Sequence, residues 1–417
     1  MFKTVKFNRN IINDFALNIL ASILLTFTTQ LIAFPYISSI TTIEQYGLVL
    51  LIMGLVNIIG VSMGNSLNNS RLLMQKKNDS KNLNGDYNII FVFLVIIVTL
   101  ISSVIAVFFY REINLTVIGI VLTSVLLLFR AYYIVDFRIN LNYKKNLLVS
   151  LYAVIGCLLG IAIAKMTGIW IAIFLFSELF AFIYLLFSVS IIKDKFSISP
   201  LFNNSLNNYF YLFLAGMISA IMMYIDRLII YPFLDPQSVS IFTVASFLGK
   251  TAGIVIGPIA GVLLSYYARE INLTLNIFYK RITFYMIGTI LIMIVIITFG
   301  EFFIEMLYPS IAPFVSQYFI VANLGAVIFI LGNLIQPILL SYCHEKWNLI
   351  LQIIYFILYG IICTLCLLNF GLMGFCYAVI FVNSLRVMFM IYSIRYFIIF
   401  NTKISLINRN ARLNSTS

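Results

Sequence analysis

The sequence of 417 residues is 62% hydrophobic and 10% charged, with a mean hydropathy of +1.07. Soluble domains usually contain about 25% charged residues. No segment of this chain is polar enough to form the water-exposed surface of such a domain. The composition therefore excludes aqueous enzyme domains and indicates a membrane protein with many spans. A net charge of +12 is also typical of nucleic-acid binding, so the positions of the basic residues have to decide between these two interpretations.

Runs of about 20 apolar residues predict twelve transmembrane helices. Their ranges are 13–38, 46–66, 87–109, 113–134, 147–165, 168–190, 208–231, 239–264, 282–299, 314–340, 348–368 and 372–397. We expect an all-α polytopic membrane protein with two six-helix bundles around a central cavity. The predicted N-terminal lobe covers 1–192, a cytoplasmic linker 193–207, the C-terminal lobe 208–400 and a cytoplasmic tail 401–417.

The basic residues are distributed as the positive-inside rule requires of short loops. Most of the 26 Lys and Arg fall in connections on the side of the amino terminus, whereas Arg111 and Lys165 fall on the opposite side. The opposite side also carries acids, such as Glu301 and Glu305. The basic surplus therefore reflects membrane topology, and we predict a multi-pass protein with both termini in the cytoplasm and no nucleic-acid partner.

The two halves of the chain share small-residue motifs. Gly60 and Gly64 in the second span lie 193 positions before Gly253 and Gly257 in the eighth span. This spacing predicts two lobes related by an axis along the membrane normal. The alternative is chance similarity, because small residues at four-residue spacing are common where transmembrane helices pack.

Several charged residues lie within the predicted spans. A charge at the centre of a bilayer costs about 2.5 to 3.5 kcal/mol on insertion scales, so each is a candidate functional residue. The cations outnumber the acids, which predicts a basic lumen that attracts anions. We therefore expect an anionic cargo. The cations are Arg130, Arg227, Lys250 and Arg386, and the acids are Glu178 and Asp226.

Two of these residues have specific alternatives. Arg130 lies one turn from the cytoplasmic end of its span, where its head group can reach the interface, so a structural role is the alternative. Glu178 has mostly apolar neighbours at helical spacing. We therefore expect Glu178 either to be protonated or to pair with a cation of another span.

Uncharged polar residues recur at helical spacing in three of the predicted spans. A stripe of small and polar residues does not face lipid, so we expect it to line the cavity. Lys250 belongs to the stripe in the eighth span, and Asn57 occupies the matching position in the first half. The predicted cavity-lining residues are Asn18, Ser22, Thr29, Asn57, Thr243 and Ser246.

Motifs for chemistry or metal binding are missing from the sequence. Gly249-Lys250-Thr251 resembles the end of a phosphate-binding loop, but the upstream glycine is absent and the tripeptide lies in an apolar span. The five cysteines lie in or beside apolar runs and show no metal-ligand spacing. We therefore expect no enzyme activity, no cofactor, no metal and no disulfide.

Three short strings occur at characteristic places relative to the predicted spans. They are Pro35-Tyr36-Ile37 with Glu44-Gln45-Tyr46-Gly47, then Asn140-Leu141-Asn142-Tyr143-Lys144-Lys145-Asn146, and Tyr224-Ile225-Asp226-Arg227-Leu228-Ile229. With the twelve spans, they resemble the polysaccharide transporter branch of the multidrug/oligosaccharidyl-lipid/polysaccharide (MOP) exporter superfamily. In particular, they are similar to O-antigen and capsular repeat-unit flippases. The second half departs from the pattern, since Ser238-Val239-Ser240 replaces the expected tyrosine-glycine pair.

The resemblance implies a flippase of the bacterial cytoplasmic (inner) membrane. It would move a polyprenyl-diphosphate-linked oligosaccharide from the inner to the outer leaflet by ion-coupled alternating access. In that scheme Lys250 and Arg386 contact the diphosphate or acidic sugars, Arg130 receives the head group, and Asp226 with Arg227 forms an outer gate. Glu178 would be the proton-coupled residue. The implied partners are the lipid-linked glycan and membrane lipid, with a polysaccharide polymerase as a candidate protein partner of a monomeric transporter.

Three alternatives share some of these features. A multidrug exporter of the same superfamily has the same architecture, but an exporter of organic cations should line its lumen with acids. A membrane-integral polysaccharide polymerase should have a long external loop with catalytic basic residues, and the external loops predicted here are short. A lipid-II-type flippase usually has fourteen spans, and the sequence contains no additional pair.

Overall fold

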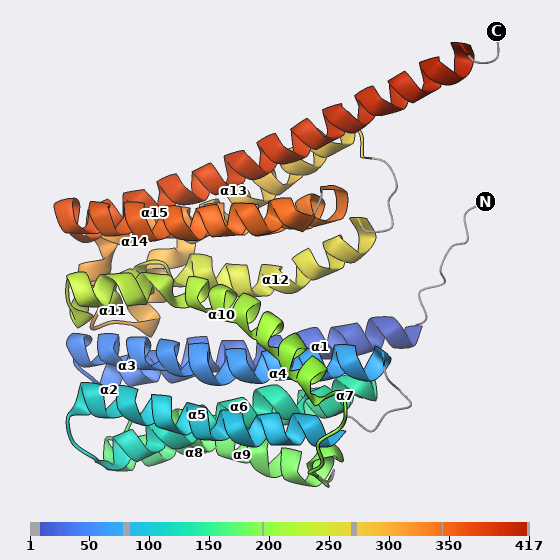
Figure 1. Cartoon of the computed structure of the whole chain (residues 1–417). Helices are drawn as coiled ribbons and strands as arrows, with labels where there is room; N and C mark the ends of the chain where they lie inside the picture. The colour runs from blue at the N-terminus through green and yellow to red at the C-terminus, as the bar shows by residue number, and fades with distance from the viewer. Residues whose placement is uncertain (1–8, 78–83, 194–195, 268–272, 344, 415–417) are drawn as a thin grey trace. The chain divides into compact units, whose positions relative to one another are not determined.

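The computed structural model describes residues 9–77, 84–193, 196–267, 273–343 and 345–414. Every regular element in these ranges is helical (Figure 1). Nine of the helical segments found there are long and apolar enough to cross a membrane. The chain is therefore an all-α, multi-pass membrane protein, as the composition predicts.

Each of the twelve predicted spans has a helical counterpart. In the first half these are α1 (Arg9–Phe27) with η1 (Thr28–Ala33) and α2 (Phe34–Ile40), α3 (Ile43–Val56) with η2 (Asn57–Val61) and α4 (Ser62–Lys77), α5 (Asn84–Tyr110), α6 (Leu115–Tyr133) with the short α7 (Val135–Ile139), α8 (Tyr143–Thr167) and α9 (Ala172–Ser188). After the short η3 (Ile191–Lys193), the second half contains α10 (Phe202–Phe233), α11 (Pro236–Ala245) with α12 (Phe247–Tyr267), α13 (Leu275–Leu307), α14 (Ala312–Tyr342) and α15 (Glu345–Asn414).

Local sequence explains where several helices begin. Thr42 and Gln45 form a reciprocal capping box at the start of α3, in which each side chain accepts a hydrogen bond from the backbone N–H of the other residue. Asn114 caps α6 through Val117 N, and Asp235 caps α11 through Ser238 N. These caps place the connections that precede α3, α6 and α11 within a few residues of the predicted positions.

Glycine divides α15 into the last two predicted spans. Gly371 has φ of +62° and ψ of −156°, a conformation that side chains with a Cβ rarely adopt. The helical ribbon therefore kinks at this residue, and the parts before and after Gly371 correspond to the predicted spans 348–368 and 372–397.

The helix at the end of the second predicted span is longer than the sequence indicates. α4 continues to Lys77, although the apolar run ends near residue 66. The expectation of a loop from residue 67 was therefore wrong for 67–77. Asn68, Ser70 and Arg71 of this segment are buried, and α4 packs against α6, which stabilises a helix whose own composition is not apolar.

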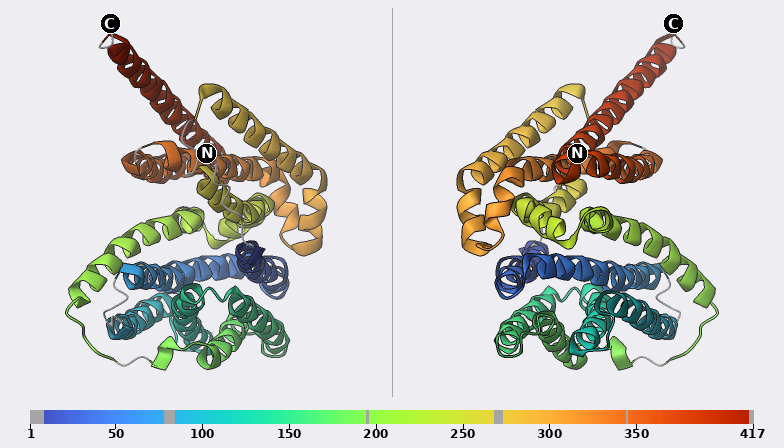
Figure 2. Two further views of the ribbon diagram at one scale, coloured as in Figure 1. Left: turned by 90° about the vertical axis from the view of Figure 1, so that its right-hand side faces the viewer. Right: turned by 90° about the vertical axis from the view of Figure 1, so that its left-hand side faces the viewer.

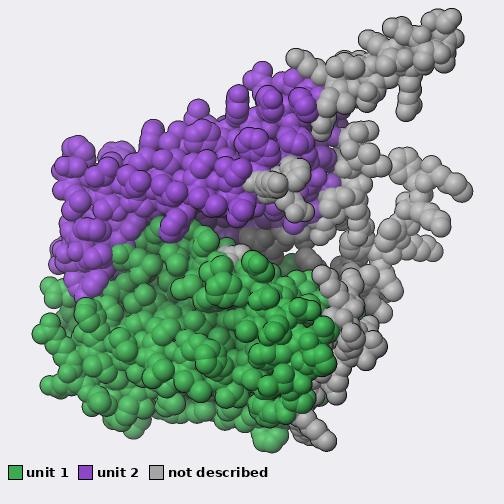
Figure 3. Space-filling model, in the orientation of Figure 1, with its two compact units in different colours: residues 1–228 green, residues 229–417 purple. Residues whose placement is uncertain are grey.

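The chain packs into two compact units, Met1–Leu228 and Ile229–Ser417 (Figure 3). In the first unit α8 packs on α1 and α9, and α6 packs on α4, α5 and α9 (Figure 2). In the second unit α14 is central and contacts α11, α12, α13 and α15. The predicted lobe boundary at 193–207 stays a prediction, and α10 packs with the first unit as far as Leu228.

Candidate functional site

Arg386 lies in the second part of α15 and is 6% exposed. Its Nη2 donates hydrogen bonds to Asn333 Oδ1 at 3.1 Å and to Gln336 Oε1 at 3.4 Å, both on α14. The guanidinium carbon lies 4.8 Å from the centre of the Phe329 ring and 5.0 Å from that of Tyr355. Aromatic faces and amide oxygens stabilise a cation without neutralising it.

Two nitrogens of this guanidinium have no hydrogen-bond partner. Nε and Nη1 are both buried and unpartnered, and Arg386 forms no ion pair within the described part of the chain. A buried charge without a counter-charge is costly, and each buried polar atom without a partner adds to that cost. The arrangement fits an anion with several oxygens, which would supply both the missing charge and the missing acceptors.

The surroundings of Arg386 are fixed by further side-chain amides. The Tyr355 hydroxyl donates to Asn383 Oδ1 at 2.8 Å, and Asn383 Nδ2 donates to the Gly325 carbonyl at 2.9 Å. Gln336 Nε2 donates to Asn348 Oδ1 at 3.3 Å. These bonds hold the Tyr355 ring and the Gln336 amide in place, so the side chains around the cation are preorganised.

Lys250 lies near the beginning of α12 and is half-buried. Its Nζ is 5.0 Å from the centre of the Phe242 ring, which in turn packs edge-on against Phe375 of α15. The preceding Gly249 donates its N–H to Asn323 Oδ1 at 2.8 Å, and Asn323 Nδ2 donates to the Ala245 carbonyl at 2.6 Å. Asn323 therefore fixes the junction between α11 and α12 from which Lys250 projects.

Lys250 and Arg386 lie at different levels of the second unit. The turn that carries Lys250 is bonded to Asn323, whereas Arg386 is bonded to Asn333 on the same helix α14. Ten positions of an α-helix correspond to about 15 Å along its axis. The two cations are therefore separate centres within this unit.

The polar residues predicted on the same stripe as Lys250 are buried. Ser246 donates its hydroxyl to the Phe242 carbonyl at 2.8 Å, one turn earlier in the chain. The Thr243 hydroxyl oxygen is buried and has no hydrogen-bond partner. The structure thus places Ser246 in a local backbone contact and leaves Thr243 with an unused donor.

Arg130 and Glu178 form an ion pair in the first unit. Arg130 Nε lies 2.6 Å from Glu178 Oε2, and Arg130 Nη2 lies 3.0 Å from Oε1. The side chains are 19% and 8% exposed. The sequence left open whether Glu178 is protonated or pairs with a cation of another span. In the structure Glu178 forms such an ion pair, which joins α6 to α9.

Asp226 and Arg227 are both buried in α10. Arg227 Nη1 donates to the Leu50 carbonyl of α3 at 2.8 Å, and the guanidinium carbon lies 5.2 Å from the centre of the Tyr224 ring. The cation is therefore directed at the backbone of α3.

The polar residues predicted to line the first two spans lie beside π-helical segments. Thr29 donates to the carbonyls of Leu25 and Thr26, and Asn57 Nδ2 donates to the Met53 carbonyl at 2.7 Å. Thr29 lies within η1 and Asn57 begins η2, and π-helical turns in membrane spans are frequent at functional positions. Ser22 is exposed on α1, and the side chain of Asn18 lies outside the described part of the chain.

Sequence analysis missed two groups of polar residues. Asn333 and Gln336 are spaced three positions apart within an apolar span, which is the pattern that could have identified them. Arg71 falls in the connection predicted between the spans 46–66 and 87–109, but it is 1% exposed on α4 and its Nη1 donates to the Tyr132 hydroxyl at 2.8 Å. Nothing in the local sequence distinguishes Arg71 from the lysines that follow it.

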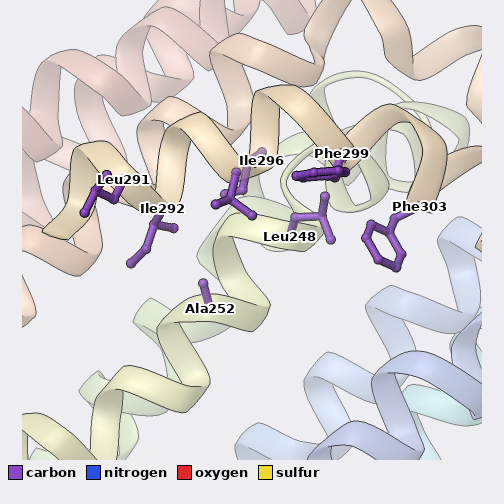
Figure 4. A pocket seen from close by; sticks show the side chains of 9 residues that line it. Leu248, Ala252, Leu291, Ile292, Ile296, Phe299 and Phe303 are labelled. Carbon is purple, nitrogen blue, oxygen red and sulfur yellow. The ribbon is translucent and has the colours of Figure 1, made fainter.

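A pocket of about 420 Å³ lies between α12 and α13 (Figure 4). Its lining is apolar throughout, so it offers no group that would recognise an ionic head group. Gly300 allows Phe319 to pack closely against α13 at the wall of the pocket, because a Cβ on residue 300 would lie only 2.4 Å from Cζ of Phe319. The lining residues are Leu248, Ala252, Leu291, Ile292, Val295, Ile296, Phe299, Gly300 and Phe303.

Comparisons by sequence find no match, either to a family model or to a curated protein. Solved structures do match over nearly the whole chain. An inward-facing multidrug resistance MATE family transporter of the MOP superfamily has a TM-score of 0.62 at 13% identity, covering 92% of this chain and 95% of the other. A MATE structure in complex with MaD3S has a TM-score of 0.65 at 12% identity, covering 94% and 96%. The lipid II flippase MurJ in an inward closed conformation has a TM-score of 0.64 at 17% identity, covering 93% and 86%. The chain therefore has the fold shared by MATE transporters and the MurJ flippase.

Proposed function

We propose that this chain is a transporter that moves a polyprenyl-diphosphate-linked oligosaccharide across the bacterial inner membrane. The observation that supports this proposal is Arg386, a buried cation that has no carboxylate partner among the described residues and two donor nitrogens without an acceptor there. A diphosphate supplies several oxygens and negative charge, so it satisfies what Arg386 lacks. The likeness to a lipid II flippase supports a lipid-linked cargo.

In this proposal Arg386 binds the diphosphate or an acidic sugar, and its amide and aromatic neighbours contact the first sugars. Amide groups and aromatic rings suit a hydrated glycan, because they offer hydrogen bonds and flat apolar faces at the same time. Lys250, at another level of the same unit, is a second anion contact along the path. Arg130 receives the head group, and Asp226 with Arg227 acts near the exit. Transport takes place by alternating access and breaks no covalent bond, so the chain is not an enzyme.

A multidrug exporter is the second candidate. The likeness to MATE transporters favours it. The buried environment of Arg386 opposes it, since an organic cation would be repelled by an uncompensated guanidinium. The charge of the cargo therefore distinguishes the two functions.

The test is deletion of the gene in its native host, followed by analysis of lipid-linked saccharides on both faces of the inner membrane. The proposal expects loss of a surface glycan and accumulation of single lipid-linked units on the inner face. A normal surface glycan, together with new sensitivity to a cationic dye, would assign the chain to drug export. In vesicles, the purified protein should expose a fluorescent polyprenyl-diphosphate saccharide to an added glycosidase, whereas vesicles without the protein should keep the inner pool protected.

A further inference from the structure

The guanidinium of Arg386 is held against one face of α14. Positions i, i+3, i+4 and i+7 of an α-helix lie on the same face, and in this part of α14 they are occupied by Phe329, Gly332, Asn333 and Gln336. Asn333 and Gln336 both accept hydrogen bonds from Nη2 of Arg386, and the Phe329 ring lies 4.8 Å from the guanidinium carbon. Three of the four residues on this face therefore interact with the cation through their side chains.

Gly332, the fourth residue of this face, leaves room for the cation. A Cβ on residue 332 would lie 3.2 Å from Nη1 and 3.5 Å from Cζ of Arg386. The first of these distances is shorter than an ordinary van der Waals contact, so an added methyl group would displace the guanidinium by a few tenths of an ångström. Glycine is unfavourable compared with alanine in the interior of a helix. Its presence at residue 332 therefore indicates a packing requirement.

A displacement of this size matters because of the hydrogen bond between Arg386 and Gln336. The distance from Nη2 to Oε1 of Gln336 is 3.4 Å, which is already longer than usual for an N–H···O bond. A separation of about 3.6 Å is no longer a hydrogen bond. A guanidinium pushed away from α14 would therefore lose this acceptor, and the cation is only 6% exposed, so water does not replace the lost bond.

We propose that Gly332 is a positioning residue of the cargo site. It lets the guanidinium lie on the main chain of α14, with Nη2 bonded to both amides, and so fixes the direction of Nε and Nη1, which have no acceptor among the described residues. Gly332 has no side chain that could contact the cargo, so it acts through Arg386. The role rests on the proposed function, because the diphosphate is the ligand that these donors would bind. Both helices belong to the second unit, so the arrangement does not require the two units to stay in contact.

The first test is a double-mutant cycle that measures binding of farnesyl diphosphate to the purified full-length protein. Gly332→Ala should raise the Kd about tenfold, as expected for loss of one hydrogen bond to a charged group. In the Arg386→Lys background the same change should alter the Kd by less than about twofold, because the lysine side chain has no Nη1 to meet the added methyl group. Equal weakening in both backgrounds would show that Gly332 does not act through the guanidinium, and would overturn the proposal.

Gly253→Ala is the matched control in the same unit. A Cβ on residue 253 of α12 would lie 3.3 Å from Cγ1 of Ile330 on α14, so the crowding is similar but the neighbour is an apolar side chain. The Kd of this variant for farnesyl diphosphate should stay within about twofold of the value for the original protein. A loss of affinity as large as that of Gly332→Ala would attribute the effect to crowding of α14 in general, and would also overturn the proposal.

Melting temperatures test the positioning role without any ligand. Alanine is favoured over glycine in a helix, but in the original protein the displaced guanidinium opposes that gain. The change in melting temperature caused by Gly332→Ala should therefore be more positive in the Arg386→Met background, where the flexible methionine side chain adapts to the added methyl group. Equal changes in both backgrounds would overturn the proposal. Failure of the proposed function has a different signature, because the original protein would then not bind farnesyl diphosphate while the difference in melting temperature would remain.

Discussion

Arg130 of α6 and Glu178 of α9 form a two-point ion pair, with Nε to Oε2 at 2.6 Å and Nη2 to Oε1 at 3.0 Å. The planar guanidinium and the carboxylate match each other in geometry, so the pair fixes the rotation of one helix against the other. If either Arg130 or Glu178 were removed, the remaining side chain would carry an unpaired charge in the apolar surroundings of two membrane spans.

Breaking one side of this pair should destabilise the protein. Removal of one partner from a fully buried pair costs about 3 to 5 kcal/mol, and the partial exposure of Arg130 lowers the expected cost to about 2 to 3 kcal/mol for Glu178→Ala. The double change Arg130→Met with Glu178→Leu should recover most of that loss, because no charge is left without a partner. Thermal unfolding in detergent micelles measures both. A double variant less stable than either single variant would contradict this explanation.

A separate variant tests whether Glu178 exchanges a proton during transport. Glu178→Gln removes the carboxylate but keeps an oxygen that accepts from Arg130, so this variant should lose less stability than Glu178→Ala. If Glu178 couples transport to protons, the variant should lose the dependence of transport on a pH gradient. The measurement is uptake into vesicles with and without an imposed gradient. Unchanged gradient dependence in Glu178→Gln would assign the ion pair a structural role alone.

The sequence predicts the helices well because each span is long and apolar, and its ends carry local capping residues. Thr42 with Gln45 and the break at Gly371 depend on neighbours within a few positions, so they can be recognised without a structure. The candidate charged residues are also recognisable, since any charge within an apolar run is conspicuous.

The partners of those charges could not be predicted. Arg130 and Glu178 are 48 positions apart, and Arg227 binds a carbonyl 177 positions away, which no residue type reveals. Arg71 was misassigned for the same reason: a polar helix end has the composition of a loop, and only packing against Tyr132 shows that it is buried. Long-range geometry decides which embedded charge is paired and which is available to a ligand.

The kink in α15 should depend on glycine at residue 371. Gly371→Ala would place a Cβ in a backbone conformation reserved for glycine, at a cost of about 1 to 3 kcal/mol. Gly360→Ala is the control in the same helix, because nothing lies within 4 Å of its Cβ position and the backbone there is helical. The control should be neutral or stabilise by about 0.5 to 1 kcal/mol. Melting temperatures compare the two variants, and equal losses would show that the conformation of Gly371 is not what matters.

Arg386 should contribute to ligand binding at the expense of stability in the empty protein. Arg386→Met removes a buried charge whose Nε and Nη1 have no partner, so the ligand-free variant should melt at the same or a higher temperature than the original protein. The same change should weaken binding of farnesyl diphosphate, a short polyprenyl diphosphate, by about ten- to hundredfold, because charge-assisted hydrogen bonds contribute about 1.5 to 3 kcal/mol. Arg386→Lys keeps the charge but has fewer donors and no flat face for Phe329 and Tyr355, so its affinity should lie between the two. A less stable Arg386→Met protein with undiminished affinity would make the cation a packing residue, and an anionic cargo would then lack its principal contact.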